Sequence, residues 1–215
     1  FIDATDNAVN RAVELVKNLM GVSRQSQLTM RPQNVNQVVR QVNALLKRSI
    51  DVQYELELDL DQNVHDCMID ENQVVQVLLN ICLNSRDAMA PGGGTISIST
   101  ANVSAEELSE SPLSLRSAPD DSGFGYVRIR VRDSGHGIPA SIHAEIFEPF
   151  YTTKPPGQGT GLGLATSKGI IEQHGGDILL QSQEHEGACF DVFLPAIPST
   201  SNAPPKLTHS NQVAK

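Results

Sequence analysis

Two glycine-rich segments lie about twenty residues apart, and they constrain the fold more than any other feature of the chain. Asp133 to Gly137 reads DSGHG, and Gly157 to Gly163 reads GQGTGLG. Glycine lets a backbone approach a bound group closely and adopt positive φ, and successive free N–H groups in such loops form a concave anion site. A helical run upstream carries Asn80 and Asn84, whose side-chain oxygens suit a hard cation. This ordered set of loops, acid and amides predicts an ATP site.

Composition narrows the class of protein. A chain of 215 residues can bury one good core and a smaller appendage. Its net charge of −9 argues against a nucleic-acid partner, so a bound nucleotide would need local backbone N–H groups, a lysine or Mg²⁺. Cys67, Cys82 and Cys189 are odd in number and widely spaced, which fits neither a disulfide framework nor a zinc site and favours a reducing compartment.

Hydropathy predicts a soluble chain. No apolar run approaches the roughly 18 residues of a membrane span, and no signal peptide opens the sequence. We therefore expect a cytoplasmic location and no membrane contact by this chain, whether or not the full-length protein is anchored to a membrane.

The first half of the chain predicts two helices and two strands. Apolar residues at three- and four-residue steps predict a helix over residues 6–26, packed either on its own domain or as half of a coiled-coil hairpin or dimer. Arg31-Pro32 indicates a linker, because the residue before proline avoids helical angles. An amphipathic helix is expected over residues 34–47. Alternation predicts a strand from Val52 to Leu58, with Val64 to Ile69 as its partner strand.

The next segments alternate between helix, strand and an irregular insertion. A helix is expected from Asp70 to Ala90, with Asp70 as N-cap and Pro91 to Gly94 as its stop. Ile96 to Thr100 predicts a strand. Residues 104–123 are rich in Ser, Pro, Asp and Glu without periodicity and indicate an insertion.

The strand around Ile129 fixes the direction of Asp133. Val127, Ile129 and Val131 alternate with arginines, so counting by two places Asp133 on the apolar face. A carboxylate aimed into a core is costly unless it is hydrogen-bonded, so we expect a specific donor for it. A helix over about residues 161–174, two strands near 178–183 and 188–194, and a polar tail after residue 198 complete the expected elements.

Four segments, in this order, resemble the ATP-binding boxes of sensor histidine kinases. Gln76 to Met89 (QVLLNICLNSRDAM) resembles the N box, and Asp133 to Pro139 (DSGHGIP) resembles the G1 box. Ile146 to Lys154 (IFEPFYTTK) resembles the F box, and Gly159 to Leu164 (GTGLGL) resembles the G2 box. The ending from His174 to Pro195 is similar to the family's last hairpin, and the resemblance is closest to hybrid-type kinases with receiver domains.

The resemblance implies the Bergerat ATP-binding fold, shared with gyrase, MutL proteins and the ninety-kilodalton heat-shock chaperones. This is a two-layer α/β (α+β) sandwich in which a mixed, mostly antiparallel sheet packs on helices, here preceded by a further helix. The implied domains are the second helix of a dimerisation hairpin (1–30), the catalytic ATP-binding domain (33–196) and a disordered linker (197–215). None of the chain's six histidines has the His-acid-Pro context of a phosphoacceptor, so we expect a fragment without one.

The implied partners follow from the family. They are the phosphoacceptor helix of the same protein and a response regulator or receiver domain, with a homodimeric full-length protein. ATP and Mg²⁺ are the implied cofactors. The implied nucleotide-binding residues are Asn80, Asn84, Asp87, Asp133, Gly135, Gly137, Ile138, Lys154, Gly159, Thr160, Gly161, Leu162 and Gly163.

Each role also has a chemical reason. Asp133 can accept from the adenine amine, which favours ATP over GTP, or it is a turn residue that ends a strand. Asn80 and Asn84 share a helix face and can ligate Mg²⁺, or they cap neighbouring backbone. Gly135 and Gly137 let the backbone approach the base and ribose. Thr160 to Gly163 would present N–H groups to phosphate at a helix start. Lys154 adds a positive charge, or is an exposed loop lysine.

Two positions depart from the family pattern. Many relatives have lysine where this chain has Asp87 and arginine where it has Thr152. Phosphate neutralisation would then depend more on Lys154, and Asp87 could hold water near the adenine or Mg²⁺.

Asn80 distinguishes transfer from hydrolysis. The related ATP hydrolases have a general-base glutamate at the matching position, and an amide cannot take a proton at neutral pH. We therefore expect phosphoryl transfer to a histidine outside this chain. The alternatives are a hydrolytic ATPase of the same superfamily and a degenerate nucleotide-binding scaffold.

Overall fold

The computed structural model describes residues 28–49, 52–104, 106–107, 125–155 and 159–197. The helix expected over residues 6–26, nearly all of the insertion 104–123 and the tail after residue 198 lie outside these ranges. No helix in the described part of the chain has the length and apolar character needed to cross a bilayer.

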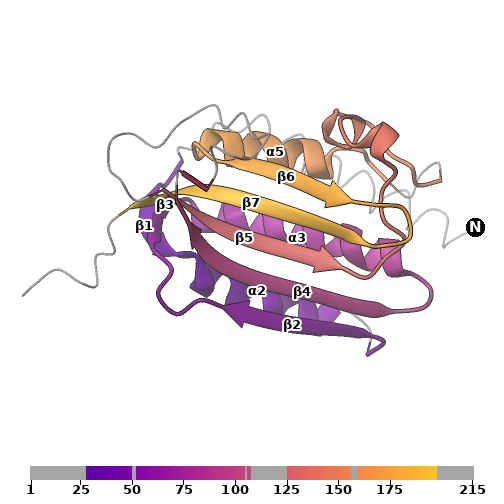
Figure 1. Cartoon of the computed structure of the whole chain (residues 1–215), viewed down its shortest axis with the longest axis horizontal. Helices are drawn as coiled ribbons and strands as arrows, with labels where there is room; N and C mark the ends of the chain where they lie inside the picture. The colour runs from indigo at the N-terminus through magenta and orange to yellow at the C-terminus, as the bar shows by residue number, and fades with distance from the viewer. Residues whose placement is uncertain (1–27, 50–51, 105, 108–124, 156–158, 198–215) are drawn as a thin grey trace, which may run out of the picture.

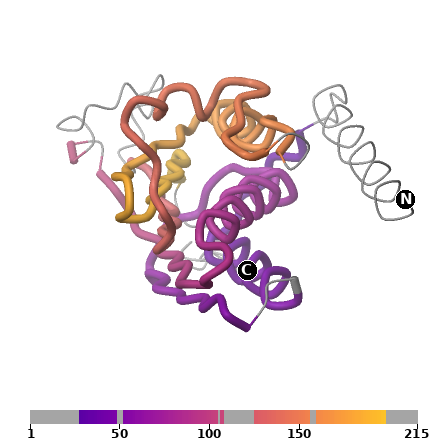
Figure 2. Tube along the Cα trace, turned by 90° about the vertical axis from the view of Figure 1, so that its right-hand side faces the viewer, coloured from indigo at the N-terminus to yellow at the C-terminus, as the bar shows by residue number. Residues whose placement is uncertain are grey.

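The described residues form two layers. One layer is a sheet, and the other contains α2 (Val35–Ser49), α3 (Glu71–Met89) and α5 (Gly163–Gln173). Figure 1 shows the sheet in front and the helices behind it, and the side view of Figure 2 shows all three helices on one side. Two short 3-10 turns, η1 (Ala140–Ile142) and η2 (Glu145–Phe147), lie between β5 and α5 along the chain.

The sheet has seven strands in the order β1-β3-β7-β5-β4-β2, with β6 beside β7. Only β2 and β4 run parallel, and every other described pair is antiparallel. This arrangement confirms the expected sandwich with a mixed, mostly antiparallel sheet. The strands are β1 (Arg31–Asn34), β2 (Tyr54–Leu60), β3 (Asp66–Ile69), β4 (Gly94–Val103), β5 (Tyr126–Asp133), β6 (Asp177–Ser182) and β7 (Ala188–Ile197).

Alternation in β4 and β5 separates a core face from an open face. Ile96, Ile129 and Val131 are fully buried toward the helices, as the pattern predicts. The intervening arginines face away from the helices, where Arg130 donates from Nε and Nη2 to the carboxylate of Asp191 at 2.7 Å each. The side chain of Asp133 is only 4% exposed, so the predicted inward direction is confirmed.

The ends of α3 follow the sequence signals. The side chain of Asp70 accepts hydrogen bonds from the backbone N–H groups of Asn72 and Gln73, which confirms it as N-cap. The helix ends at Met89, just before the predicted stop. Gly93 adopts φ +75° there against the backbone of Gln53, a position where a side chain would clash.

A buried histidine joins the end of α5 to the start of α3. His174 Nε2 accepts from the Asp70 N–H at 3.0 Å, and Nδ1 lies 2.7 Å from the carbonyl oxygen of Ile170. The ring therefore carries its proton on Nδ1, which donates to that carbonyl. After it, Gly175 at φ +74° and Gly176 end the helix as expected, with their N–H groups donating to the carbonyls of Glu172 and Ile171.

Two expectations about the first half are wrong. The linker expected at Arg31-Pro32 is instead strand β1, which pairs with β3. The strand expected as the partner of β2 is β3, but β3 pairs with β1 and β7, whereas β2 pairs in parallel with β4. Residue alternation reports which face of a strand is buried but carries no information about its neighbour.

Candidate nucleotide site

Asp133 ends β5 with its carboxylate held by three donors. Oδ1 accepts from the N–H groups of Gly135 at 3.0 Å and Ala188 at 3.1 Å, and Oδ2 accepts from the hydroxyl of Ser85 at 2.7 Å. An ionised carboxylate has about four acceptor positions, so one remains on Oδ2. The remaining position is directional because the other three bonds fix the orientation of the carboxylate.

Ser85 is the residue that sequence reasoning did not assign. It lies on the buried stripe of α3, four residues after Ile81 and four before Met89. A serine in an apolar helix stripe needs a hydrogen-bond partner, and that signal could have identified it. Cys82 shares this environment, where burial, with a smaller contribution from Asp133, raises its pKa to about 12. The thiol therefore stays neutral beside the carboxylate.

The loop after Asp133 is clamped between α3 and the hairpin of β6 and β7. The His136 N–H donates to the carbonyl of Ala88, and a Cβ on Gly135 would lie 2.9 Å from that residue. Gly137 has φ +71°, and a Cβ there would collide with the carbonyl oxygen of Gln183. Both glycines are thus required by contacts within the protein.

Ile138 fixes the far end of the same loop. Its N–H donates to Ser182 Oγ at 2.8 Å, and that hydroxyl donates to the Gly187 carbonyl at 2.7 Å. The Ile138 carbonyl lies 2.9 Å from His143 Nε2, and its side chain packs on the main core.

Asn80 links α3 to the start of α5. Its Nδ2 donates to the Gly163 carbonyl and to Ser167 Oγ, each at 3.4 Å. The amide thus binds neighbouring backbone through nitrogen, while Oδ1 takes no part in these two bonds. The Asn80 side chain can therefore bond to neighbouring backbone through Nδ2 and serve as a metal ligand through Oδ1, so the two expected roles are compatible.

Lys154 brings the predicted phosphate-side residues together. Its Nζ lies 2.6 Å from Asp87 Oδ2 and 3.4 Å from Asn84 Oδ1. Arg86 donates to Asp87 Oδ1 from Nε at 2.9 Å and from Nη2 at 2.6 Å. Burial opposes ionisation of Asp87, but the hydrogen bonds from Lys154 and Arg86 outweigh it and lower its pKa. Asp87 thus binds two cationic side chains here, and a water-holding role for it stays a prediction.

The start of α5 coincides with the last residue of the second glycine segment. The helix begins at Gly163, two residues later than expected, without a side-chain N-cap hydrogen bond. Uncapped N–H groups in a first helical turn are available to an anion. Thr160 Oγ1 accepts from the Leu162 N–H at 3.3 Å. Gly161, at φ +65°, packs against Phe150, whose N–H donates to the Gly161 carbonyl at 2.9 Å.

Gly159 lies over the Lys154 stem. A Cβ on Gly159 would come within 2.5 Å of Thr152 Oγ1 and 3.3 Å of the Lys154 side chain. The predicted residues therefore gather on two neighbouring parts of the surface of the C-terminal half of α3. Asp133 and the loop that follows it adjoin Ser85 and Ala88, whereas Asn80 adjoins the start of α5, and Asn84 and Asp87 adjoin Lys154.

The donor set fits one class of metal ion. The described residues contain no cluster of three His, Cys, Asp or Glu side chains able to hold a metal. Amide oxygens, as on Asn80 and Asn84, suit Mg²⁺, which keeps several waters and is held largely by phosphate oxygens. A protein-only transition-metal site would need softer or more numerous ligands.

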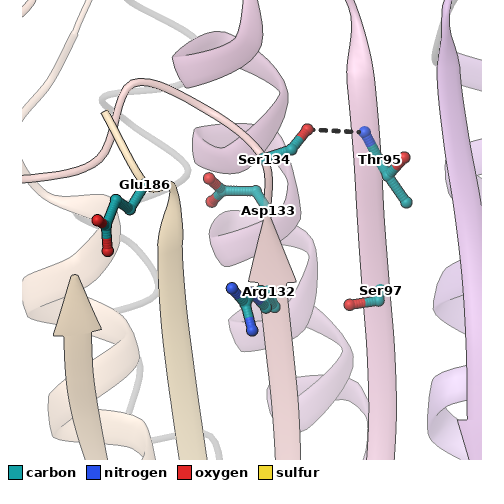
Figure 3. A pocket seen from close by; sticks show the side chains of 6 residues that line it. All are labelled: Thr95, Ser97, Arg132, Asp133, Ser134 and Glu186. Carbon is teal, nitrogen blue, oxygen red and sulfur yellow. Dashed lines mark hydrogen bonds between the residues drawn. The ribbon is translucent and has the colours of Figure 1, made fainter. Parts of the chain in front are cut away.

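A separate hollow of about 250 Å³ lies on the helix-free face of the sheet (Figure 3). Thr95 and Ser97 line it, and they alternate with Ile96 and Ile98, which face the helices. Arg132 also lines it, and Ser134 Oγ accepts from the Thr95 N–H at 3.1 Å. This hollow shares Asp133 with the candidate site but lies on the other side of the sheet from α3.

Comparison with known proteins agrees with this geometry. The family described as "Histidine kinase-, DNA gyrase B-, and HSP90-like ATPase" matches residues 69–198. The chain is 40% identical over 190 residues to the sensor kinase CckA of Brucella abortus (strain 2308). This alignment covers 87% of this chain and 19% of that protein. It is 33% identical over 189 residues to the sensor histidine kinase ZraS of Salmonella typhimurium (strain LT2), covering 87% of this chain and 36% of that protein.

A solved structure has the same fold. The histidine kinase ThkA in complex with the response regulator protein TrrA superposes with a TM-score of 0.68 at 26% identity, over 92% of this chain and 51% of that chain. The chain spans 19% of the length of CckA and 36% of the length of ZraS. It belongs to the family of histidine kinase-, DNA gyrase B- and HSP90-like ATPases, as a catalytic ATP-binding domain of the Bergerat fold with sensor histidine kinases as relatives.

Proposed function

We propose that this chain binds ATP with Mg²⁺ and donates the γ-phosphate to a histidine on a dimerisation hairpin of the same protein. The phosphoryl group then passes to an aspartate of a response regulator or receiver domain. The full-length protein is a homodimer, and this domain acts in the cytoplasm.

The chemistry around Asn80 is the observation that carries the proposal. The amide cannot accept a proton from water at neutral pH, and its Nδ2 is bonded to Gly163 and Ser167. Asp87 is a carboxylate one helical turn from Asn84, but Lys154 and Arg86 lower its pKa and weaken it as a base. Asn80 and Asp87 are thus both poor general bases for water, which favours transfer to a protein nucleophile.

Asp133 supports an adenine nucleotide. Its remaining acceptor position on Oδ2 suits the exocyclic amine of adenine, and guanine presents a carbonyl oxygen at that place. Two acceptors facing each other in a buried site lose a hydrogen bond and repel. Gly135 and Ile138 shape the adjoining loop, whose backbone follows the base.

The side of α3 that carries Asn80 and Asn84 supports the phosphates. Asn84 and Asn80 would hold Mg²⁺ through their side-chain oxygens, and the bound ion would supply charge neutralisation at the β- and γ-phosphates. The uncapped N–H groups at Gly163 receive phosphate oxygens, and Thr160, Gly161 and Leu162 lead the chain into that turn. Gly159 lets the segment lie close to Lys154.

The partners are proposed from relatives. ThkA is seen in complex with the response regulator TrrA, and the superposition covers 92% of this chain. By analogy, this domain acts with a response regulator, and a hairpin of the same protein presents a histidine to its γ-phosphate.

Phosphoryl transfer tests the proposal. The chain alone should bind ATP and show neither appreciable ATPase activity nor incorporation of labelled γ-phosphate. Extension with the upstream hairpin helix should give a dimer that acquires an acid-labile, base-stable phosphoryl group, as expected of a phosphohistidine. Asn84→Ala in the extended protein should abolish this labelling. Strong ATPase activity of the chain alone would favour the hydrolase, and an extended dimer that binds ATP without labelling would favour the scaffold.

A further inference from the structure

The ammonium group of Lys154 lies close to the side-chain oxygen of Asn84, which is one of the proposed Mg²⁺ ligands. Lys154 Nζ lies 3.4 Å from Asn84 Oδ1 and 2.6 Å from Asp87 Oδ2, and the Lys154 side chain is 33% exposed. The lysine comes from the segment after η2, whereas both partners lie on α3. A group 70 residues away in sequence thus reaches the side of α3 that carries the proposed cation ligand Asn84.

An ammonium and a divalent cation cannot both occupy this position. An amide oxygen has two lone pairs, but two positive charges a few ångströms apart repel strongly where water is partly excluded. We propose that Lys154 and Mg²⁺ compete for Asn84 Oδ1, and that Asp87 is the positioning residue that holds Lys154 there in the nucleotide-free protein. This inference rests on the proposed Mg²⁺–ATP binding and identifies what the cation must displace.

Arg86 makes the contact reversible. It donates two hydrogen bonds to Asp87 Oδ1, on the carboxylate oxygen that Lys154 does not use. When Lys154 moves away, Asp87 keeps its ion pair with Arg86. The movement of Lys154 therefore leaves no unpaired charge in a partly buried position. The released ammonium keeps its charge and can turn toward an anionic phosphate.

Lys154 can leave Asn84 while a nearby backbone hydrogen bond, from Phe150 to Gly161, stays in place. The Lys154 N–H donates to Thr152 Oγ1 at 3.2 Å within the same segment, and Gly159 packs on the lysine stem. The hydrogen bond from Phe150 to Gly161 is independent of Lys154 and ties the two sides of the segment together. Displacement of Lys154 therefore loosens its own contacts and leaves this bond in place.

The test compares ATP affinity without and with Mg²⁺. Calorimetry gives the ratio of the Kd in EDTA to the Kd in saturating Mg²⁺ for the wild-type chain and for Lys154→Met, which keeps an apolar stem. Competition predicts that Lys154→Met raises this ratio about three- to fivefold, the range expected for a partly exposed ion pair. A lysine that only neutralises phosphate would lower both affinities equally and leave the ratio unchanged.

Asp87→Asn tests whether Asp87 acts through Lys154. It should change the ratio in the wild-type background and leave it unchanged in the Lys154→Met background. Lys47→Met is the matched control, because it removes one positive charge from an exposed position at the end of α2. An unchanged ratio in Lys154→Met, or equal effects of Asp87→Asn in both backgrounds, would overturn the inference. Failure of the wild-type chain to bind ATP under either condition would overturn the proposed function and the inference with it.

Discussion

Ser85 donates its hydroxyl hydrogen to Asp133 Oδ2 across 2.7 Å, and so joins the C-terminal half of α3 to the end of β5. The bond fixes the carboxylate that the sheet directs inward, and it occupies one of the two acceptor positions on Oδ2. Ser85 thereby sets the direction of the position that remains. The base-binding end of the site depends on this pair, because the other two bonds to Asp133 come from backbone N–H groups.

Removing the Ser85 hydroxyl should weaken both folding and binding. Ser85→Ala leaves a nearly buried carboxylate with one donor fewer, so we expect the free energy of unfolding to fall by about 1–3 kcal/mol. ATP affinity should also fall, because the carboxylate loses a fixed orientation. Urea denaturation and calorimetry measure the two effects. Ser97→Ala, on the open face of β4, is the control and should change neither quantity; equal behaviour of the two variants would contradict the assigned role.

Gly137 and Gly169 should respond oppositely to the same substitution. Gly137→Ala places a Cβ against the Gln183 carbonyl at φ +71°, so we expect it to destabilise the protein by more than about 1 kcal/mol. Gly169 lies inside α5, and an added Cβ would meet no atom within 4 Å beyond its chain neighbours and the helix's own backbone, so Gly169→Ala should stabilise by up to about 1 kcal/mol. Thermal unfolding of both variants measures the difference. A stable Gly137→Ala protein would contradict the close contact of the loop with the β6–β7 hairpin.

Cys67 should make the protein less stable at high pH. Burial, with a smaller contribution from Asp66, raises its pKa from 9.0 to about 12. Below pH 9 the thiol is neutral in both states. As the pH rises from 9 toward 12, the unfolded chain ionises first and the free energy of unfolding falls.

The comparison with Cys67→Ala isolates this effect. The variant is less stable at pH 8 because of its cavity, but its stability should fall less steeply between pH 9 and 11. Urea denaturation across this range measures both slopes. Identical slopes would mean that the Cys67 thiol ionises equally in the folded and unfolded states.

Local sequence patterns predicted most helices and strands and the inward direction of Asp133. They did not predict contacts between residues that are far apart in the sequence. Asp70 was predictable as N-cap because an acid before a periodic apolar run has a local consequence. The burial of Asp133 followed from counting by two along β5. The neighbours of β3 were not predictable, since strand order depends on the whole sheet.

The partner of Asp87 shows the same limit within the site. The sequence marked Asp87 as a departure from the family pattern, but its lysine lies 67 residues downstream. Only the packing of the segment after η2 on α3 brings the two charges together. Ser85 lay within the N-box motif, yet its role became clear only from the position of Asp133.

Calorimetric titration of ATP and GTP, with Mg²⁺, into the wild-type chain and Asp133→Asn shows whether Asp133 recognises adenine. We expect the wild-type chain to bind ATP in the micromolar range and GTP much more weakly. Asp133→Asn keeps the shape but removes the charge and an acceptor, so ATP affinity should fall by about 1–3 kcal/mol or more. Lys47→Met is a folded control with wild-type ATP affinity. Equal affinity for ATP and GTP, or full ATP affinity in Asp133→Asn, would contradict the account.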